Sequence, residues 1–350
     1  MVPLAAPVLS PGPNGSVPWT AVAFALALCA LALPRVAPAA DPAGGLREAR
    51  SDSAWLQAVQ DAARRQSFSG TVVYQRGDEV HASRVVQLFD GTDSRERVLT
   101  LDGQPREFIR QGDEVQCLYP LLRRVVIERG GARSFPSFAE PLSADVLNHY
   151  DLRHLGSERV AGRPCDVAEL VPRDRLRYGY RLCVEPSTGL LFKAQTLNEK
   201  REVLEQISFT DVRLGEPIDP AQLRPSWSSA GWKVDRQASQ ATELRQQGWS
   251  VTAPSGFHRL AEVVRHLMGA GNAEHEALQA VYSDGLATVS VFIEPGAPLM
   301  EEPEDAQQRG PLTAVSRTVG DARITVVGEV PRNTAQAIAD SVVHSSPPPR

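Results

Sequence analysis

Few residues in this chain have the types and spacing that chemistry requires. His258, His266 and His275 are eight and nine residues apart, which is not a metal-ligand spacing. The acidic pair Glu301 and Glu302 lies in an expected loop and is better explained as solvated charge. The sequence contains no G-x-S-x-G, S-x-x-K, H-E-x-x-H or P-loop signature. We therefore expect a protein that is not an enzyme and needs no metal or cofactor.

Residues 165–184 have the alternating pattern of two strands joined by a loop. If residues 172–176 form the loop, Val171 faces Arg177. The two residue numbers of each facing pair then add up to 348. Glu169 then lies opposite Gly179, diagonally between Arg177 and Arg181, within reach of favourable cross-strand charge pairs. This meander is expected to form the centre of a β-rich domain.

The same register predicts a disulfide. It places Leu170 across from Tyr178 on one face and Cys165 opposite Cys183, and an exported protein meets an oxidising compartment. Cys117 would remain a thiol. The alternative is that Cys165 and Cys183 are two buried, reduced cysteines.

Turn residues recur every ~8–12 positions through the first half of the chain, which is typical of an antiparallel meander. Helices are expected at residues 53–66 and 142–150. Further strands are expected at residues 70–75, 80–89, 96–101, 107–111, 115–119, 124–128, 190–197 and 203–212. The expected fold class is α+β, with a strongly curved antiparallel sheet covered by helices.

Residues 215–232 contain three prolines and no periodicity, which predicts a linker. It separates an N-terminal domain at residues 46–214 from a smaller α/β domain at residues 233–344. The smaller domain is expected to hold an antiparallel sheet with hairpins at 278–293 and 313–329. Its expected helices lie at 260–268 and 333–342, the second with a capping box formed by Asn333 and Gln336.

Residues 1–40 have the pattern of a signal peptide. The apolar run at residues 20–34 precedes Ala37-Pro38-Ala39-Ala40, which offers the small residues of a cleavage site. Leu28 before Cys29 does not fit a lipoprotein signal, so a lipid anchor is the second choice. The formal net charge of −5 argues against binding to nucleic acid.

Four sequence words carry a family resemblance: RYGYRL followed by a TGLL turn, SFSGTVVY at residues 67–74, SDGLATVSVFIEP at 283–295, and ITVVGEVP at 324–331. The chain resembles the MucB/RseB family of periplasmic regulators of sigma-E-type envelope stress factors. The resemblance implies a half-barrel like that of LolA and LolB, followed by a smaller α/β domain. It also implies binding to the periplasmic segment of a membrane-anchored anti-sigma factor and protection of that segment from site-1 proteolysis. Lipid or lipopolysaccharide-like amphiphiles would weaken this binding, and a homodimer is compatible with the resemblance.

A curved sheet covered by helices can enclose an apolar cavity. The candidates to line it are Trp55, Phe68, Tyr74, Tyr178 and Tyr180. The alternative is that these side chains fill the core. A second functional hypothesis, a periplasmic lipid or lipoprotein carrier, rests on the fold analogy alone, and a carrier would need only the first domain.

Overall fold

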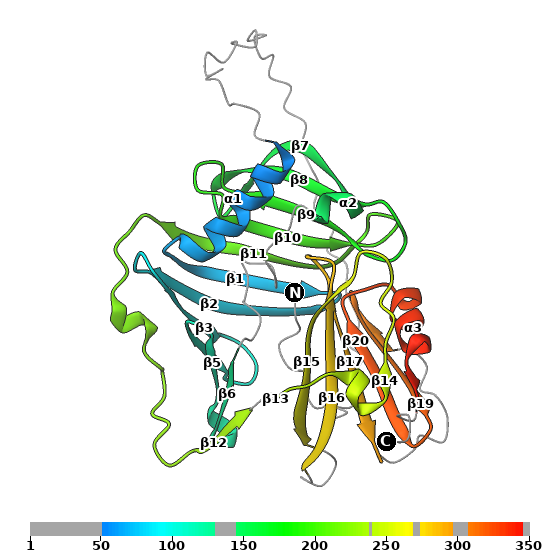
Figure 1. Cartoon of the computed structure of the whole chain (residues 1–350). Helices are drawn as coiled ribbons and strands as arrows, with labels where there is room; N and C mark the ends of the chain where they lie inside the picture. Colours follow the sequence, from blue (N-terminus) through cyan, green and yellow to red (C-terminus); the bar gives the residue numbers. More distant parts are fainter. Residues whose placement is uncertain (1–50, 130–144, 238–239, 269–273, 297–306, 346–350) are drawn as a thin grey trace, which may run out of the picture. The chain divides into compact units, whose positions relative to one another are not determined.

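Closely spaced turns and alternating side chains build most of the chain into two sheets (Figure 1). The computed structural model describes residues 51–129, 145–237, 240–268, 274–296 and 307–345. These residues belong to one compact unit. The predicted signal peptide and the acidic pair at residues 301 and 302 lie outside the described residues.

The large sheet has twelve strands in the order β12-β6-β5-β4-β3-β2-β1-β11-β10-β9-β8-β7. All neighbours pair antiparallel except β12 and β6, which are parallel. Its strands are β1 (Phe68–Arg76), β2 (Glu79–Phe89), β3 (Ser94–Thr100), β4 (Glu107–Gln111), β5 (Glu114–Tyr119), β6 (Arg124–Arg129), β7 (Tyr150–Val160), β8 (Arg163–Pro172), β9 (Gly179–Val184), β10 (Leu191–Leu197), β11 (Val203–Leu214) and β12 (Lys233–Gln237).

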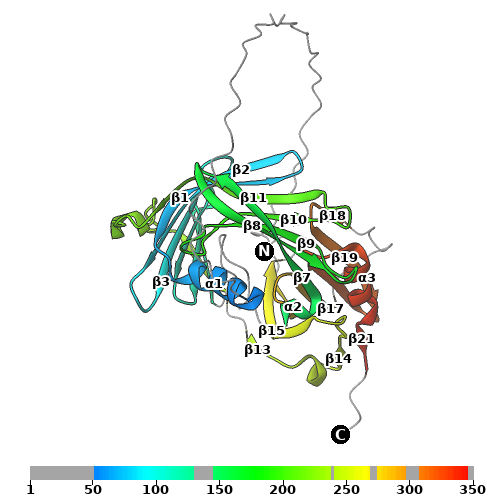
Figure 2. The same ribbon diagram turned by 90° about the horizontal axis from the view of Figure 1, so that it is seen from above.

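Helix α1 (Asp52–Arg65) lies against the inner face of the curved sheet (Figures 1 and 2). Its buried stripe includes Leu56 and Val59, as the helical spacing predicts. The turn before β10 approaches the helix so closely that a Cβ on Gly189 would lie 2.9 Å from the carbonyl oxygen of Ala58. Gly189 also has a φ of +80°, so both space and backbone favour glycine there.

The small sheet has seven strands in the order β13-β15-β16-β17-β20-β19-β18, and α3 (Arg332–Ser341) packs on β19 and β20. A separate pair joins β14 (Trp249–Ser250) to β21 (Val343–His344). The strands of the small sheet are β13 (Gln240–Ala241), β15 (His258–Met268), β16 (Glu274–Ser283), β17 (Thr288–Pro295), β18 (Gln307–Arg309), β19 (Leu312–Val319) and β20 (Ala322–Gly328). The shorter helices are α2 (Val146–His149), η1 (Pro120–Leu122), η2 (Pro220–Leu223) and η3 (Leu244–Gln247).

The predicted fold class is confirmed: a large curved sheet with few helices is followed by a separate, smaller antiparallel sheet. The large sheet is open, with β12 and β7 as its two edges. Each sheet has its own buried apolar cluster, which includes Phe209 in the first domain and Val291 in the second.

The predicted register of the central meander is wrong by two residues. Facing positions of β8 and β9 sum to 350, so Glu169 faces Arg181 directly and Leu170 faces Tyr180. The turn between the strands is longer than expected because Arg177 leaves the strand and directs its side chain elsewhere. A shift of two residues keeps every side chain on its predicted face, and Arg181 Nη2 donates to Glu169 Oε2 at 3.1 Å.

Cys165 and Cys183 form a disulfide in the structure, with their Cα atoms 5.4 Å apart. Val167 is the residue that faces Cys183, so the bridge joins diagonal positions of the two strands. Both cysteines are fully buried in the large-sheet core, and Cys117 is a partly buried free thiol.

Thiol counting tests the disulfide chemically. Unfolded protein without residues 1–40 is expected to show one reactive thiol, and the variant Cys117→Ser none. Replacing Cys165 and Cys183 by alanine is expected to lower the free energy of unfolding by about 3 kcal/mol at most, because the closed loop is short. Three thiols in the unmodified chain would contradict the bridge.

Three predicted helical features differ in the structure. Residues 260–268 form strand β15, because the valines and leucines that suggested a helix pair with β16 instead. The helix expected at 142–150 is described only as α2, and it is followed by the unpredicted strand β7. The predicted capping box of α3 is absent, since Asn333 Nδ2 donates to the carbonyl oxygen of Arg175.

The predicted linker at residues 215–232, which we call the strap, lies on the large sheet. Arg97 Nη1 on β3 donates to the carbonyl oxygen of Gln222 at 2.9 Å, and Ser226 N donates to Glu107 Oε2 on β4 at 2.9 Å. The strap leads into β12, which pairs with β6. Strand β12 still belongs to the large sheet, and β13 is the first strand of the small one.

Candidate functional site

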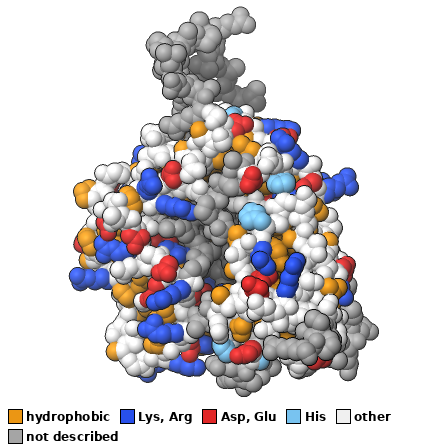
Figure 3. Space-filling model, in the orientation of Figure 1, with side chains coloured by type: hydrophobic (Ala, Val, Ile, Leu, Met, Phe, Trp, Pro, Cys, Tyr) orange, Lys and Arg blue, Asp and Glu red, His pale blue; other side chains and the backbone are white. Residues whose placement is uncertain are grey.

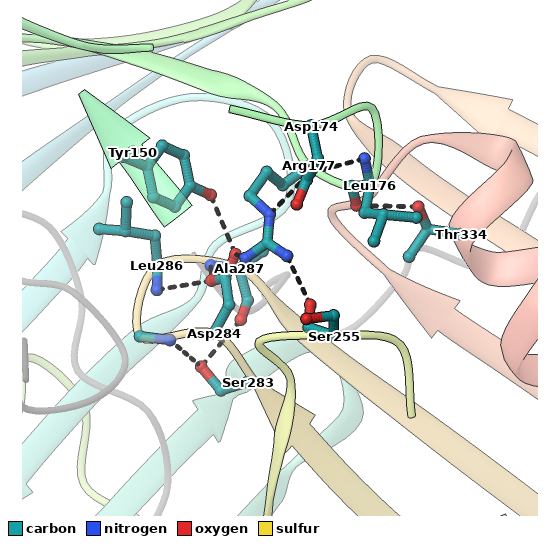
Figure 4. A network of polar contacts seen from close by, with 11 residues as sticks. Tyr150, Asp174, Leu176, Arg177, Ser255, Ser283, Asp284, Leu286, Ala287 and Thr334 are labelled. Carbon is teal, nitrogen blue, oxygen red and sulfur yellow. Dashed lines mark hydrogen bonds and ion pairs between the residues drawn. The ribbon is translucent and has the colours of Figure 1, made fainter. Parts of the chain in front are cut away.

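A network of polar contacts lies where the β8–β9 turn meets the small-sheet domain; we call it the seam (Figure 4). Arg177 stands at its centre with a side-chain exposure of 0%. Its Nη1 donates to Asp284 Oδ2 at 2.9 Å, its Nε to Asp174 Oδ1 at 3.0 Å, and its Nη2 to the carbonyl oxygen of Ser255 at 2.7 Å.

Asp284 is held in place by its own turn between β16 and β17. Its Oδ1 accepts hydrogen bonds from the backbone N–H groups of Leu286 and Ala287, at 2.9 and 2.8 Å. Its Oδ2 accepts from the Tyr150 hydroxyl at 3.0 Å as well as from Arg177. Asp284 thus receives four hydrogen bonds, which offset the cost of burying its charge.

Two aromatic rings enclose the Arg177 guanidinium. Its central carbon lies 5.8 Å from the ring centroid of Tyr150 and 5.1 Å from that of Phe257, within cation–π range. Burial lowers the pKa of Arg177, but the hydrogen bond to Asp174 and the charge of Asp284 outweigh it and raise that pKa. Burial, followed by the charge of Asp284, raises the pKa of the Tyr150 hydroxyl well above its ordinary value. The seam is therefore a clasp built around a buried and charged Arg177.

Helix α3 adds neutral contacts beside the clasp. Thr334 Oγ1 donates to the carbonyl oxygen of Leu176 at 2.8 Å, and the Leu176 side chain packs on the small-sheet core. Farther along, Gln308 Nε2 donates to the Tyr178 hydroxyl at 3.1 Å, and Arg309 pairs with Glu79. The two sheets are thus joined by both polar and apolar contacts.

The five predicted cavity residues occupy different surroundings. Phe68 packs edge-on against Phe209 and Trp55 edge-on against His154, whereas the Tyr180 ring is tilted by 53° to that of Tyr150. The Tyr74 hydroxyl donates to Glu205 Oε2 at 2.7 Å. Phe68, Tyr178 and Tyr180 are buried, whereas Trp55 and Tyr74 are partly buried at the edge of the core. Their role as a lipid-binding set stays a prediction.

A cavity of about 510 Å³ lies elsewhere, beside β15 in the small-sheet domain. It is lined by Glu243, Arg245, Val251, Arg259, Glu262 and Tyr282. The lining contains charges of both signs, and Arg259 pairs with Glu262 at 2.8 Å. Such a lining does not suit an acyl chain, and it includes none of the five predicted residues.

The remaining surface offers no concentrated charge on the face in view. Acidic and basic side chains are interspersed, and hydrophobic ones occur singly or in small groups (Figure 3). Within the described residues, no three His, Cys, Asp or Glu side chains gather as metal ligands. No described helix has the length and apolar character needed to cross a membrane.

Sequence reasoning missed both charged partners of the seam. Arg177 fitted the alternation of a strand, and Asp284 was interpreted only as a turn residue. A usable signal was the S-D-G turn, since an Asp at that position can accept hydrogen bonds from the backbone N–H groups that follow it.

Comparisons with known proteins agree with this architecture. The MucB/RseB N-terminal domain family matches residues 51–227, and the MucB/RseB C-terminal domain family matches residues 243–343. The sigma factor AlgU regulatory protein MucB of Pseudomonas aeruginosa is 34% identical over 303 residues, covering 84% of this chain and 92% of that protein. The sigma-E factor regulatory protein RseB of Salmonella typhimurium is 30% identical over 331 residues, covering 91% of this chain and 96% of that protein.

A solved structure extends the match to three dimensions. The crystal structure of MucB in complex with MucA(peri) aligns with a TM-score of 0.66 and 31% sequence identity, covering 84% of this chain and 99% of that chain. The predicted resemblance is confirmed in both domains: this chain belongs to the MucB/RseB family.

Proposed function

We propose that this protein binds the periplasmic segment of a membrane-anchored anti-sigma factor and shields it from site-1 proteolysis. The observation that carries the proposal is the match of both domains to a family of sigma-factor regulatory proteins, one of which is known in complex with MucA(peri). A carrier would need only the large-sheet domain, whereas this chain holds both.

Export of the protein is part of the proposal. Residues 1–40 would be removed as a signal peptide, which leaves the protein in the periplasm beside its membrane-anchored partner. N-terminal sequencing of protein recovered from the cell envelope checks this. A terminus upstream of residue 20, or a lipid on Cys29, would refute it.

Lipid or lipopolysaccharide-like amphiphiles would act by opposing the bound segment. A segment that contacts both sheets favours one arrangement of the seam. An amphiphile that prefers another arrangement weakens the binding of the segment by at most the ratio of the amphiphile's affinities for the two arrangements. The effect is reciprocal, so the segment must weaken amphiphile binding by the same factor. A tenfold effect needs about 1.4 kcal/mol of coupling.

A titration tests both parts. The purified anti-sigma segment is titrated into the protein with and without a lipid A-like amphiphile below its micelle threshold, and sedimentation of the same samples reports any homodimer. We expect tight binding that the amphiphile weakens about tenfold. If no amphiphile changes the affinity for the anti-sigma segment, the proposed lipid response is wrong, but the proposed protection of the segment from proteolysis stands. Absence of segment binding, together with lipid transfer between vesicles, would favour the carrier.

A further inference from the structure

The turn between β5 and β6 holds two leucines out into solvent. Leu121 and Leu122 each expose 69% of their surface, and both belong to the short helix η1. Turns are ordinarily built from Gly, Pro, Asn, Asp and Ser, so the two leucines that follow Pro120 are unusual there. We call residues 119–124 the leucine tip.

The leucine tip is firmly held. Arg123 adopts a left-handed backbone with φ +47°, and its N–H donates to the carbonyl oxygen of Pro120 at 3.1 Å. Lys233 N donates to the carbonyl oxygen of Arg123 at 2.9 Å, which ties the tip to β12. A small buried cluster underneath consists of Leu118, Val125 and Ile127, with Ile109 and Trp232 packed against it. The leucines are therefore presented by a supported turn and not by a loose loop.

Basic side chains surround the tip. Residues 119–124 and 231–235 contain Arg123, Arg124 and Lys233 against one acid, Asp235. Asp235 is engaged by Arg124 and by Lys233, the latter at 3.3 Å. Arg123 is exposed, and the Lys233 side chain is 65% exposed. Beside them Val234 exposes a further 50% of its surface. Exposed apolar side chains therefore stand next to a net positive charge.

We infer that the leucine tip inserts into the surface of an anionic lipid bilayer. Leucine side chains at the headgroup boundary gain by leaving water, while neighbouring Arg and Lys are attracted to anionic lipids. A bilayer is favoured as the occupant because the two leucines are exposed at a turn and stand beside basic side chains, which is the combination that an anionic lipid surface attracts. The inference does not depend on the proposed function, although it would hold the protein beside a membrane-anchored partner.

Vesicle flotation tests the inference. The purified protein is mixed with vesicles of phosphatidylethanolamine and phosphatidylglycerol, or of phosphatidylcholine alone. We expect it to float with the anionic vesicles, and several-fold less at high salt because screening weakens the basic contacts. The variant Leu121→Asp/Leu122→Asp is expected to bind anionic vesicles at least about tenfold more weakly. The matched control Leu155→Asp changes a leucine on β7 that is 48% exposed, and it should bind like the unmodified protein.

Two further variants separate the apolar from the charged contribution. Leu121→Ser/Leu122→Ser removes the apolar groups without adding charge and should also lose binding, with an unchanged circular dichroism spectrum. Asn tolerates a left-handed backbone, so the variant Arg123→Asn should keep the turn and reduce mainly the salt-sensitive part of the vesicle binding. Equal flotation of the leucine variants and the unmodified protein would overturn the inference. The inference would also be overturned if the unmodified protein did not float with anionic vesicles. The same holds if the leucine variants lost binding to the anti-sigma segment but kept binding to the vesicles.

Discussion

Replacing Arg177 by alanine is expected to lower the free energy of unfolding by about 3–5 kcal/mol, because it leaves Asp284 buried without its cationic partner. The Asp284 side chain is 0% exposed and cannot regain water without opening the seam. The change also leaves the Ser255 carbonyl oxygen without its Arg177 donor and removes the cation from between Tyr150 and Phe257. Urea denaturation followed by circular dichroism measures the loss.

A matched control separates burial from charge. Arg173 lies in the same turn and pairs with Asp151 at 2.8 Å, but both side chains are about half exposed. The variant Arg173→Ala is therefore expected to lose at most about 1 kcal/mol. Equal losses from the two arginine variants would contradict the central role given to Arg177.

A double-mutant cycle measures the coupling itself. Arg177→Ala and Asp284→Ala should each be costly, whereas the double variant should cost clearly less than their sum, since neither charge is then left unpaired. Additive losses would mean that the two side chains stabilise separate parts of the molecule.

The fold was largely accessible from local sequence patterns. Alternation with period two and regularly spaced turns locate strands without knowledge of tertiary contacts, and the buried stripe of α1 follows from helical spacing. The patterns fail where tertiary pairing decides. Val263 and Val264 suit a helix face as well as a strand, and pairing with β16 makes them part of β15.

The seam could not be predicted in the same way. Arg177 and Asp284 are separated by 107 positions, and no periodic pattern relates residues on different sheets. The register error has the same origin. The strand pattern allowed Arg177 to continue β9, but its bond to Asp284 draws it out and lengthens the turn.

The second large effect is expected at the strap, where Glu107→Gln should speed chymotryptic cleavage after Trp227 by about 10–100-fold. The Glu107 carboxylate is 0% exposed and accepts hydrogen bonds from Arg97 Nε at 2.5 Å and from Ser226 N and Oγ at 2.9 and 3.0 Å. Hydrogen bonds to a charged group contribute about 1.5–3 kcal/mol. Weakening them raises the population in which the strap is detached, and cleavage follows that population when opening is fast.

Limited proteolysis with mass spectrometry makes the measurement, with Glu202→Gln as the control. Glu202 accepts a hydrogen bond from Asn198 in an exposed turn, so its replacement should leave cleavage after Trp227 unchanged. In the unmodified protein we expect the protease to cut the strap before it cuts the central meander. This order of cleavage would support the proposal of two separable domains. Cleavage within residues 176–193 while the bond after Trp227 stays intact would contradict that proposal.

Combining the strap and seam variants distinguishes two ways in which the sheets are held together. A detached strap leaves the small sheet connected through Arg177 and its neighbours, so Glu107→Gln alone should release no separate domain after cleavage. Glu107→Gln with Arg177→Ala weakens both attachments, so more of the cleaved protein should separate on gel filtration without denaturant than with either change alone. If Glu107→Gln alone releases them, the clasp is too weak to carry a binding signal between the sheets. If the double variant stays joined, the remaining contacts, among them the pairing of β12 with β6 and the hydrogen bond of Thr334 to Leu176, are sufficient to hold the sheets together.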